Sequence, residues 1–160
     1  MTSPSAPEPA PDPDRPEDGG PAALYDAIAA EHAAIYGYGM VSAHSLPIRN
    51  YLVSTTLAEH RRRREQAVSL LTERSVSAPL PAIGYQLPME VKSPTEAARL
   101  AVQMENDCAV AWRAVLEQTD SEQDREFAVT ALTQCAVRAA LWREVLGAWP
   151  VTEAFPGGGE

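Results

Sequence analysis

This 160-residue chain has only two cysteines, a single lysine and no long apolar run. Two cysteines are too few for a disulfide framework. No segment reaches about 18 consecutive apolar residues, and the N-terminus lacks the pattern of a secretory signal. The 13 basic residues stand against 22 acidic ones, and the net charge of −9 argues against a nucleic-acid or membrane-surface binder. We therefore expect a cytoplasmic protein without a membrane span.

The two ends of the chain differ in composition from its middle. Residues 1–20 hold six prolines and several acidic residues but few apolar side chains, so burial cannot offset the entropy of ordering them. We expect a disordered, Pro-rich acidic tail over residues 1–20 and a loose C-terminal tail over residues 151–160. The remaining residues, 21–150, form one domain that is long enough to build a core.

Four long segments of this domain have helical periodicity, at residues 21–45, 49–74, 93–118 and 119–147. The clearest start signal is "SPTE", in which Ser93 is the N-cap, Pro94 the first helical residue and Glu96 the third. These residues make a complete capping box with proline in its favoured place. Pro150 follows the fourth segment closely and prevents a much longer helix.

The connections between the segments predict how they are arranged. Short loops join the first segment to the second and the third to the fourth, so each pair is expected to form an antiparallel hairpin. About 18 residues, "SVSAPLPAIGYQLPMEVK", separate the second segment from the third. Fully extended they reach roughly 60 Å, more than the roughly 37 Å of a 25-residue helix. The sequence therefore predicts an all-α, ferritin-like four-helix bundle: two antiparallel helix hairpins joined by a long crossover.

Polar residues interrupt the apolar stripes of these segments near their middles. The first three stripes contain Glu31, His60 and Glu105, and the fourth has Cys135 at the matching height. If the turn between the third and fourth segments centres near Asp120, Glu105 lies level with Cys135. Four stripes thus predict one polar layer across the centre of the bundle.

A buried carboxylate must be paired, protonated or bound to metal, which leaves more than one reading of this layer. In the first, Glu31, Glu105 and His60 form a closed hydrogen-bonded network, assisted by Arg64, Arg138 or a tyrosine hydroxyl. In the second, the same three residues bind Fe, Mn or Zn, with a fourth ligand from the set Cys135, His32 and Glu59. The third possibility is that the assumed helix register is in error.

The segment "YGYG" places two glycines inside the first helix, where each costs roughly 1 kcal/mol relative to alanine. We interpret Tyr36, Gly37, Tyr38 and Gly39 as a helix-packing or dimer contact, because small residues allow a close approach and tyrosines add contact area. This interpretation predicts a homodimer. The run "RRRR" at residues 61–64 is expected to be a solvated face, with Arg64 reaching towards the core acids.

Four stretches of the chain resemble the ferritin-like superfamily and, more narrowly, the actinobacterial ferritin-like proteins grouped as the DUF4439 family. They are "ALYDAIAAEHAAIYGYGMV" at 23–41, "LAEHRRRRE" at 57–65, "PAIGYQLP" at 81–88 and "AFPG" at 154–157. The resemblance covers about residues 21–157. It implies a ferritin-like fold and brings no established activity.

Di-iron members of the superfamily carry one Glu on each of two helices and a Glu-x-x-His pair on each of the other two. By this resemblance Glu31 and Glu105 match the single acids and His60 matches one histidine, whereas Leu57, Leu132 and Cys135 replace the remaining ligands. Ferroxidase or oxygenase chemistry is therefore not expected. We expect a non-catalytic binding or structural module with a degenerate di-iron core, or alternatively a protein with a reduced, mononuclear Glu/His metal site.

Overall fold

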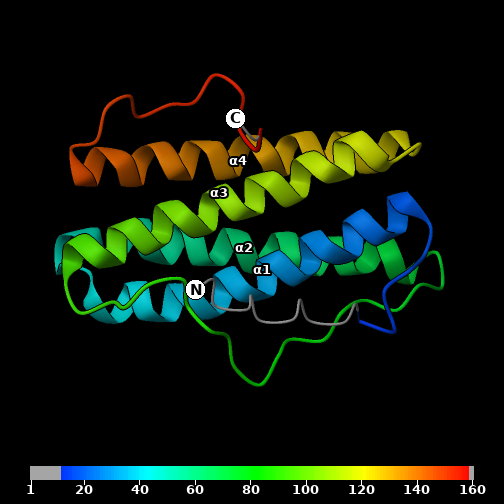
Figure 1. Ribbon diagram of the computed structural model, residues 1–160, viewed down its shortest axis with the longest axis horizontal. Coiled ribbons are helices and arrows are strands. Elements are labelled where there is room, and N and C mark those ends of the chain that lie inside the picture. The colour runs from blue at the N-terminus through cyan, green and yellow to red at the C-terminus, as the bar shows by residue number, and fades with distance from the viewer. Residues whose placement is uncertain (1–11, 159–160) are drawn as a thin grey trace, which may run out of the picture.

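The computed structural model describes residues 12–158, and within them the chain is all α-helical with no strand. The four long helices are α1 (Gly19–His44), α2 (Asn50–Thr72), α3 (Pro94–Gln118) and α4 (Glu122–Leu146), with a short 3-10 helix, η1 (Pro47–Arg49), between α1 and α2 (Figure 1). The predicted all-α four-helix bundle is confirmed, and each predicted helix boundary lies within a few residues of the observed one.

Local sequence signals account for the ends of α3 and α4. The Ser93 hydroxyl accepts a hydrogen bond from the Glu96 backbone N–H at 3.2 Å, as the capping box predicts. The Glu96 carboxylate, however, accepts from the Lys92 backbone N–H at 2.6 Å, so the reciprocal half of the box involves the residue before the N-cap. Gly147 ends α4 in the left-handed conformation, with φ of 65°, where glycine has no Cβ to clash.

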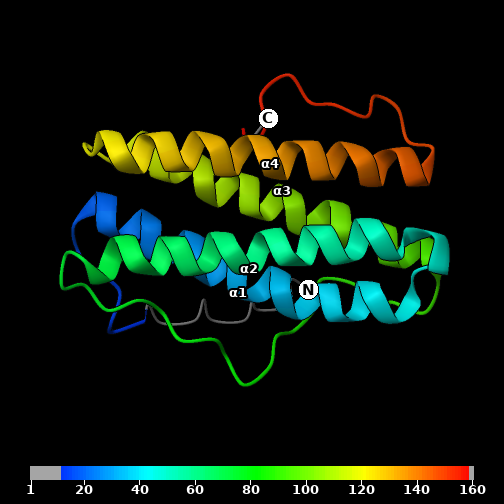
Figure 2. The ribbon, with the colours of Figure 1, turned by 180° about the vertical axis from the view of Figure 1, so that it is seen from behind.

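The helices form the two predicted antiparallel hairpins, α1–α2 and α3–α4 (Figure 1). The hairpins meet mainly through α1 and α3, whereas α2 and α4 contact each other very little. Residues 73–93 cross the length of the bundle on the outer side of α1, as seen from both sides in Figures 1 and 2. His32 and Tyr36 of α1 contact this crossover at Pro79 and Tyr85.

The structure describes parts of the two segments predicted to be tails. Residues 1–11 lie outside the described residues, but Arg15 pairs with Asp26 of α1 and Asp12 accepts a hydrogen bond from the Tyr25 hydroxyl. Gly19 and Gly20 already belong to α1. The segment after α4 also packs on the bundle, because a Cβ on Gly157 would lie 2.5 Å from the Ala109 carbonyl oxygen of α3. The composition of these segments does not predict such contacts, because only a few polar groups and one glycine make them.

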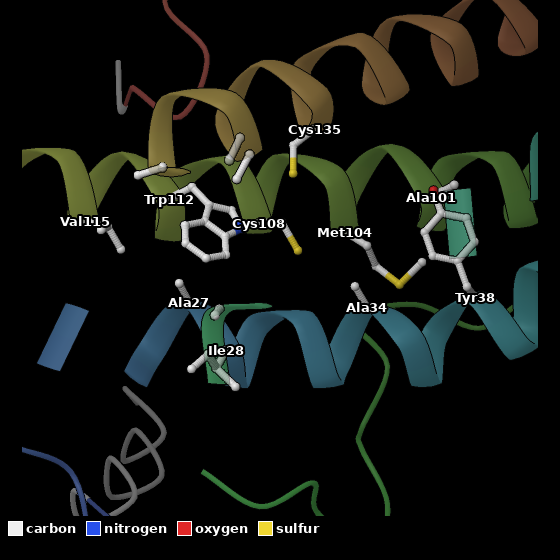
Figure 3. Packing of buried hydrophobic residues seen from close by; sticks show 14 of the residues in the cluster. Ala27, Ile28, Ala34, Tyr38, Ala101, Met104, Cys108, Trp112, Val115 and Cys135 are labelled. Carbon is white, nitrogen blue, oxygen red and sulfur yellow. The ribbon is translucent and has the colours of Figure 1, made fainter. Parts of the chain in front are cut away.

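An apolar core fills the bundle between the helices (Figure 3). Its largest fully buried apolar side chains include Leu24 and Ile28 from α1 and Trp112 and Val115 from α3. Burying such side chains contributes roughly 1.5–3 kcal/mol each, which is the main stabilisation of the bundle. This core frames the polar layer at the centre and keeps water from it.

Candidate functional site

Glu31, His60, Glu105 and Cys135 lie together at the centre of the bundle, each with no solvent exposure. Each comes from a different helix, and hydrogen bonds described below connect them. The residues that interrupt the four apolar stripes thus meet in one buried polar layer. A charged group at this depth has no water to solvate it, so its partners must come from the protein.

His60 is the bridge of the layer. Its Nδ1–H donates to Glu31 Oε2 at 2.6 Å and its Nε2–H donates to Glu105 Oε1 at 3.0 Å. Burial by itself lowers the pKa of His60, but Glu105 and Glu31 outweigh this effect and raise the pKa to about 10. His60 is therefore an imidazolium at neutral pH, with both ring nitrogens acting as donors.

Glu31 is saturated with hydrogen-bond donors. Besides His60, its Oε1 accepts from the Trp112 indole N–H at 2.7 Å and from Arg63 Nη1 at 3.0 Å. Burial raises the pKa of Glu31, yet His60, Arg63 and Trp112 together lower the pKa below its usual 4.5. Glu31 is thus a carboxylate held by two cations and one neutral donor.

Arg63 supplies the second cation, with its side chain only 3 % exposed. Its guanidinium donates to Gln134 Oε1 at 3.0 Å and to Cys135 Sγ at 3.3 Å, and lies 3.5 Å from Glu59 Oε1. Glu59 in turn accepts from Arg138 at 2.7 Å. Arg63 therefore connects α2 to α4 as well as to α1.

The prediction that Arg64 reaches the core acids is wrong. Arg64 is about a quarter exposed and pairs with Glu65, and Leu57 is only partly buried. The inner face of α2 carries Thr56 and Arg63 instead. Positions 56, 60 and 63 and positions 57, 60 and 64 are both acceptable helical stripes through His60, and the structure uses the first.

Glu105 has one oxygen within the network and one without a partner. Its Oε1 accepts from the Tyr38 hydroxyl at 2.6 Å, and that hydroxyl accepts from the Trp142 indole N–H at 3.0 Å. Glu105 Oε2 is buried and has no hydrogen-bond partner among the described residues, and the same holds for Thr56 Oγ1. Tyr38, predicted as part of a packing surface, belongs to the polar layer.

The remaining predicted residues lie outside the layer. His32 is buried against the crossover, where its Nε2 lies 3.1 Å from the Pro79 carbonyl oxygen, and burial lowers its pKa. Tyr36 packs on Tyr85 with ring centroids 5.3 Å apart. At Gly37 an added Cβ would lie 2.1 Å from Met104 Sδ, so this glycine permits close packing of α1 on α3; Gly39 faces open space.

A second cysteine completes the centre of the bundle. Cys108 of α3 is buried, and its thiol donates to the Ala30 carbonyl oxygen at 3.7 Å. A hydrogen bond with Cys135, together with burial, raises the pKa of Cys108 well above its usual value. Ligand atoms of Glu31, His60 and Cys108 all lie within 4.8 Å of one another, which makes these three residues a candidate metal-ligand set.

The family model described as "Domain of unknown function (DUF4439)" matches residues 23–160. This chain belongs to the DUF4439 family. Its structure is similar to the crystal structure of a conserved hypothetical protein, Rv2844, from Mycobacterium tuberculosis. The two chains are 58% identical with a TM-score of 0.80, and the match covers 86% of this chain and 97% of that one. The comparison with curated proteins gave no match.

Four side chains of this DUF4439 centre escaped the sequence analysis. They are Cys108, Trp112, Trp142 and Arg63, and of these only Arg63 has an expected place above, in the solvated run at residues 61–64. For the tryptophans a signal existed, because a buried indole N–H needs an acceptor and the predicted layer offered carboxylates. For Arg63 no signal separates it from its neighbours in "RRRR".

Proposed function

We propose that this DUF4439 protein is a ferritin-like bundle that acts as a non-catalytic binding or structural module, with an ionic network in place of a metal centre. Two carboxylates, Glu31 and Glu105, are balanced by two cations, His60 and Arg63. Such a network keeps the polar centre in one arrangement, because removal of any member leaves a buried charge without its partner.

The observation that carries this proposal is the engagement of His60 by carboxylates on both ring nitrogens. A metal ligand must offer a lone pair, and an imidazolium has none. The donor set does not fit a di-iron centre either. Arg63 places a guanidinium beside Glu31, and α4 contributes Cys135 where a carboxylate would be needed to bridge two metals.

Metal analysis of protein purified without a histidine tag tests the proposal. We expect substoichiometric Fe, Mn and Zn in the purified protein. Aerobic addition of ferrous iron should form ferric iron no faster than in buffer or with Glu31→Ala. Stoichiometric iron, or oxidation well above both controls, would contradict the proposal.

A mononuclear metal site is the second candidate, favoured by the mutual proximity of Glu31, His60 and Cys108. These residues offer one oxygen, one nitrogen and one sulfur ligand, a set that suits Zn²⁺. Binding would require loss of protons from His60 and Cys108. Titration with Zn²⁺ should therefore release protons and raise the melting temperature of the wild type but not of Cys108→Ser. The absence of both effects in the wild type excludes this candidate.

A homodimer in the cytoplasm is proposed for the assembly. No helix in the described part of the chain combines the length and apolar character that a membrane span needs. Tyr36 and Gly39 lie on the exposed side of α1 and support a contact between copies, whereas Gly37 and Tyr38 are used within the bundle. Light scattering after size-exclusion chromatography should give twice the 17.3 kDa chain mass; the mass of one chain would contradict the dimer.

A further inference from the structure

A cavity of about 190 Å³ lies at the end of the bundle where α1 and α4 end and α2 and α3 begin. Figure 1 shows these four helix ends together at the left, away from the α3–α4 turn. The α1–α2 connection, the first turn of α3 and the last turns of α4 form the wall of this cavity. Trp142 separates it from the central layer, because the indole lines the cavity while its N–H donates to the Tyr38 hydroxyl at 3.0 Å.

The charge on this wall is positive. Among the described residues that line the cavity, Arg49 of η1 is the one charged side chain, and none is acidic. Arg49 is partly buried, and the ion pairs of the described residues use other arginines. Two helices begin and two end here, so their dipoles largely offset one another. The guanidinium therefore sets the local charge and favours an anion.

A hydroxyl beside the cavity also lacks a partner. Ser45 lines the cavity, and its Oγ is buried without a hydrogen-bond partner among the described residues. An unmatched buried hydroxyl costs roughly 1–3 kcal/mol, and a bound acceptor would remove that cost. A serine side chain has three staggered positions, so this hydroxyl can turn towards the cavity. Ser45 and Arg49 come from the same connection and together offer donors to an oxyanion.

The rest of the wall is mainly apolar and limits the size of a ligand. Ala98 and Trp142 form its buried part, each 1% exposed, and Val145 and Leu146 extend it along α4. Leu46 also lines the cavity and is 52% exposed, so a bound apolar group would cover part of its surface. Since an apolar cavity of about 150 Å³ holds benzene, this one has room for a single ring or a short chain but not for a nucleotide.

We propose that this cavity binds a small monocarboxylate with a compact apolar body, such as an aromatic or short aliphatic acid. Arg49 donates to the two carboxylate oxygens, as a planar guanidinium does best, and Ser45 donates to one of them. The apolar body packs against Trp142 and the last turns of α4. One cation balances the single charge of a carboxylate, whereas a phosphate dianion would keep an uncompensated charge.

This inference goes beyond the proposed function, which concerns the ionic layer at the centre of the bundle. Ligand binding at the end of the bundle needs neither a metal nor its absence. Metal analysis therefore decides the proposed function, and a carboxylate titration decides this inference, so that either can fail while the other stands.

The test is a nitrogen-15 NMR titration of the full chain with benzoate, in a buffer free of other carboxylates. We expect saturable shifts of the Ser45, Thr95 and Ala98 amides and of the Trp142 indole N–H, which surround the cavity. The Trp112 indole N–H, bonded to Glu31 in the central layer, should not shift. Benzyl alcohol, which has the same ring without the charge, should bind at least about tenfold more weakly, because hydrogen bonds to charged groups contribute about 1.5–3 kcal/mol.

Two variants locate the charge that the ligand meets. Arg49→Gln should weaken benzoate binding by about tenfold or more. The matched control is Arg99→Gln, since Arg99 is exposed on α3, does not line the cavity and should leave the affinity unchanged.

Three results would overturn the proposal: no saturable shift in the wild type, equal binding of benzyl alcohol and benzoate, or equal effects of the two arginine variants. The comparison of benzoate with benzyl alcohol uses the wild type alone, so it is decisive even if a substituted chain does not fold.

Discussion

In the described part of the chain, buried carboxylates meet arginines both at one end of the bundle and at its centre, and the buried charge is balanced differently in these two places. At one end, Asp124 of α4 is buried but pairs with Arg74, whose side chain is 32% exposed, at 2.6 and 2.5 Å. At the centre, Glu31 pairs with His60 and Arg63, which are 1% and 3% exposed. A cation that reaches water retains part of its hydration, whereas a fully buried one must be balanced entirely by protein groups.

This difference in exposure explains why several groups surround Glu31 at the centre, whereas a single arginine pairs with Asp124 at the end of the bundle. Asp124 also has a local reason for its position, because its backbone N–H bonds to the Ser121 hydroxyl that caps α4. No residue of the central layer caps a helix. Its members come from four helices, so the layer forms only when the helices pack together, and it links the helices to one another. Substitutions at the centre should therefore cost more than equivalent ones at the end.

The largest effect is expected for Glu105→Ala. This change leaves the His60 imidazolium with one carboxylate instead of two and the Tyr38 hydroxyl without its acceptor. The free energy of unfolding should fall by about 3–5 kcal/mol, the usual cost of breaking a buried pair. The matched control is Glu59→Ala. Glu59 pairs with the partly exposed Arg138 and lies 3.5 Å from Arg63, which keeps Glu31 as its partner, so the loss should be less than half as large. Equal urea midpoints for the two variants would contradict the prediction that a residue of the layer contributes more stability than a residue beside it.

The next effect is a loss of stability at alkaline pH. In the unfolded chain His60 loses its proton near the usual pKa of 6.5, but in the folded chain the two carboxylates raise the pKa to about 10. Between these values the unfolded state binds fewer protons, so the free energy of unfolding falls as pH rises. The contribution of His60 is complete below pH 6.5 and lost above about 10.

Denaturant unfolding from pH 6 to 10 measures this dependence. Asp124→Asn, which alters the end pair and leaves His60 in place, should keep the alkaline decline. His60→Gln should be less stable at pH 6 and show a flatter profile. An alkaline decline of the same size in His60→Gln would assign the effect to other groups.

A smaller loss is expected for Asp124→Ala. The change removes the partner of Arg74 and the acceptor of the Thr119 hydroxyl, but Arg74 can then turn to water. We expect the free energy of unfolding to fall by about 1–2 kcal/mol, measured by urea unfolding. A loss as large as that of Glu105→Ala would show that exposure of the cation does not determine how much stability each site contributes.

The smallest effects distinguish two glycines of α1. Gly37→Ala forces Met104 to shift, because the new Cβ would lie 2.1 Å from its Sδ, and should destabilise by about 1 kcal/mol or more. Gly39→Ala meets open space and should stabilise by about 0.5–1 kcal/mol through helix propensity. Thermal melts of the two variants should shift in opposite directions. A shift in the same direction would place Gly39 in a contact.

The sequence predicted the fold well because its signals are local. Ser93, Pro94 and Gly147 mark helix ends through their own backbone preferences, and the long proline-containing crossover leaves few topologies. The polar layer was predictable too, since Glu31, His60 and Glu105 each interrupt an apolar stripe. Periodicity shows which face of a helix is buried, and these three residues lie on buried faces.

The partners within the layer could not be predicted in the same way. A stripe through His60 accommodates either Arg63 or Arg64, and a rotation of α2 by part of a turn decides between them. The choice depends on Gln134 and Cys135 of α4, which the sequence does not place relative to α2. The hydrogen bonds of Trp112 and Trp142 likewise depend on side-chain orientation.

The central claim is that two cations, one of them a doubly protonated His60, hold the buried carboxylates where a metal would otherwise be needed. Nitrogen-15 NMR of the imidazole at pH 8, on protein purified without a histidine tag, tests this claim most directly. We expect both His60 ring nitrogens to carry protons at this pH, where an ordinary histidine is neutral. A His60 ring with an unprotonated or metal-bound nitrogen at pH 8 would contradict it.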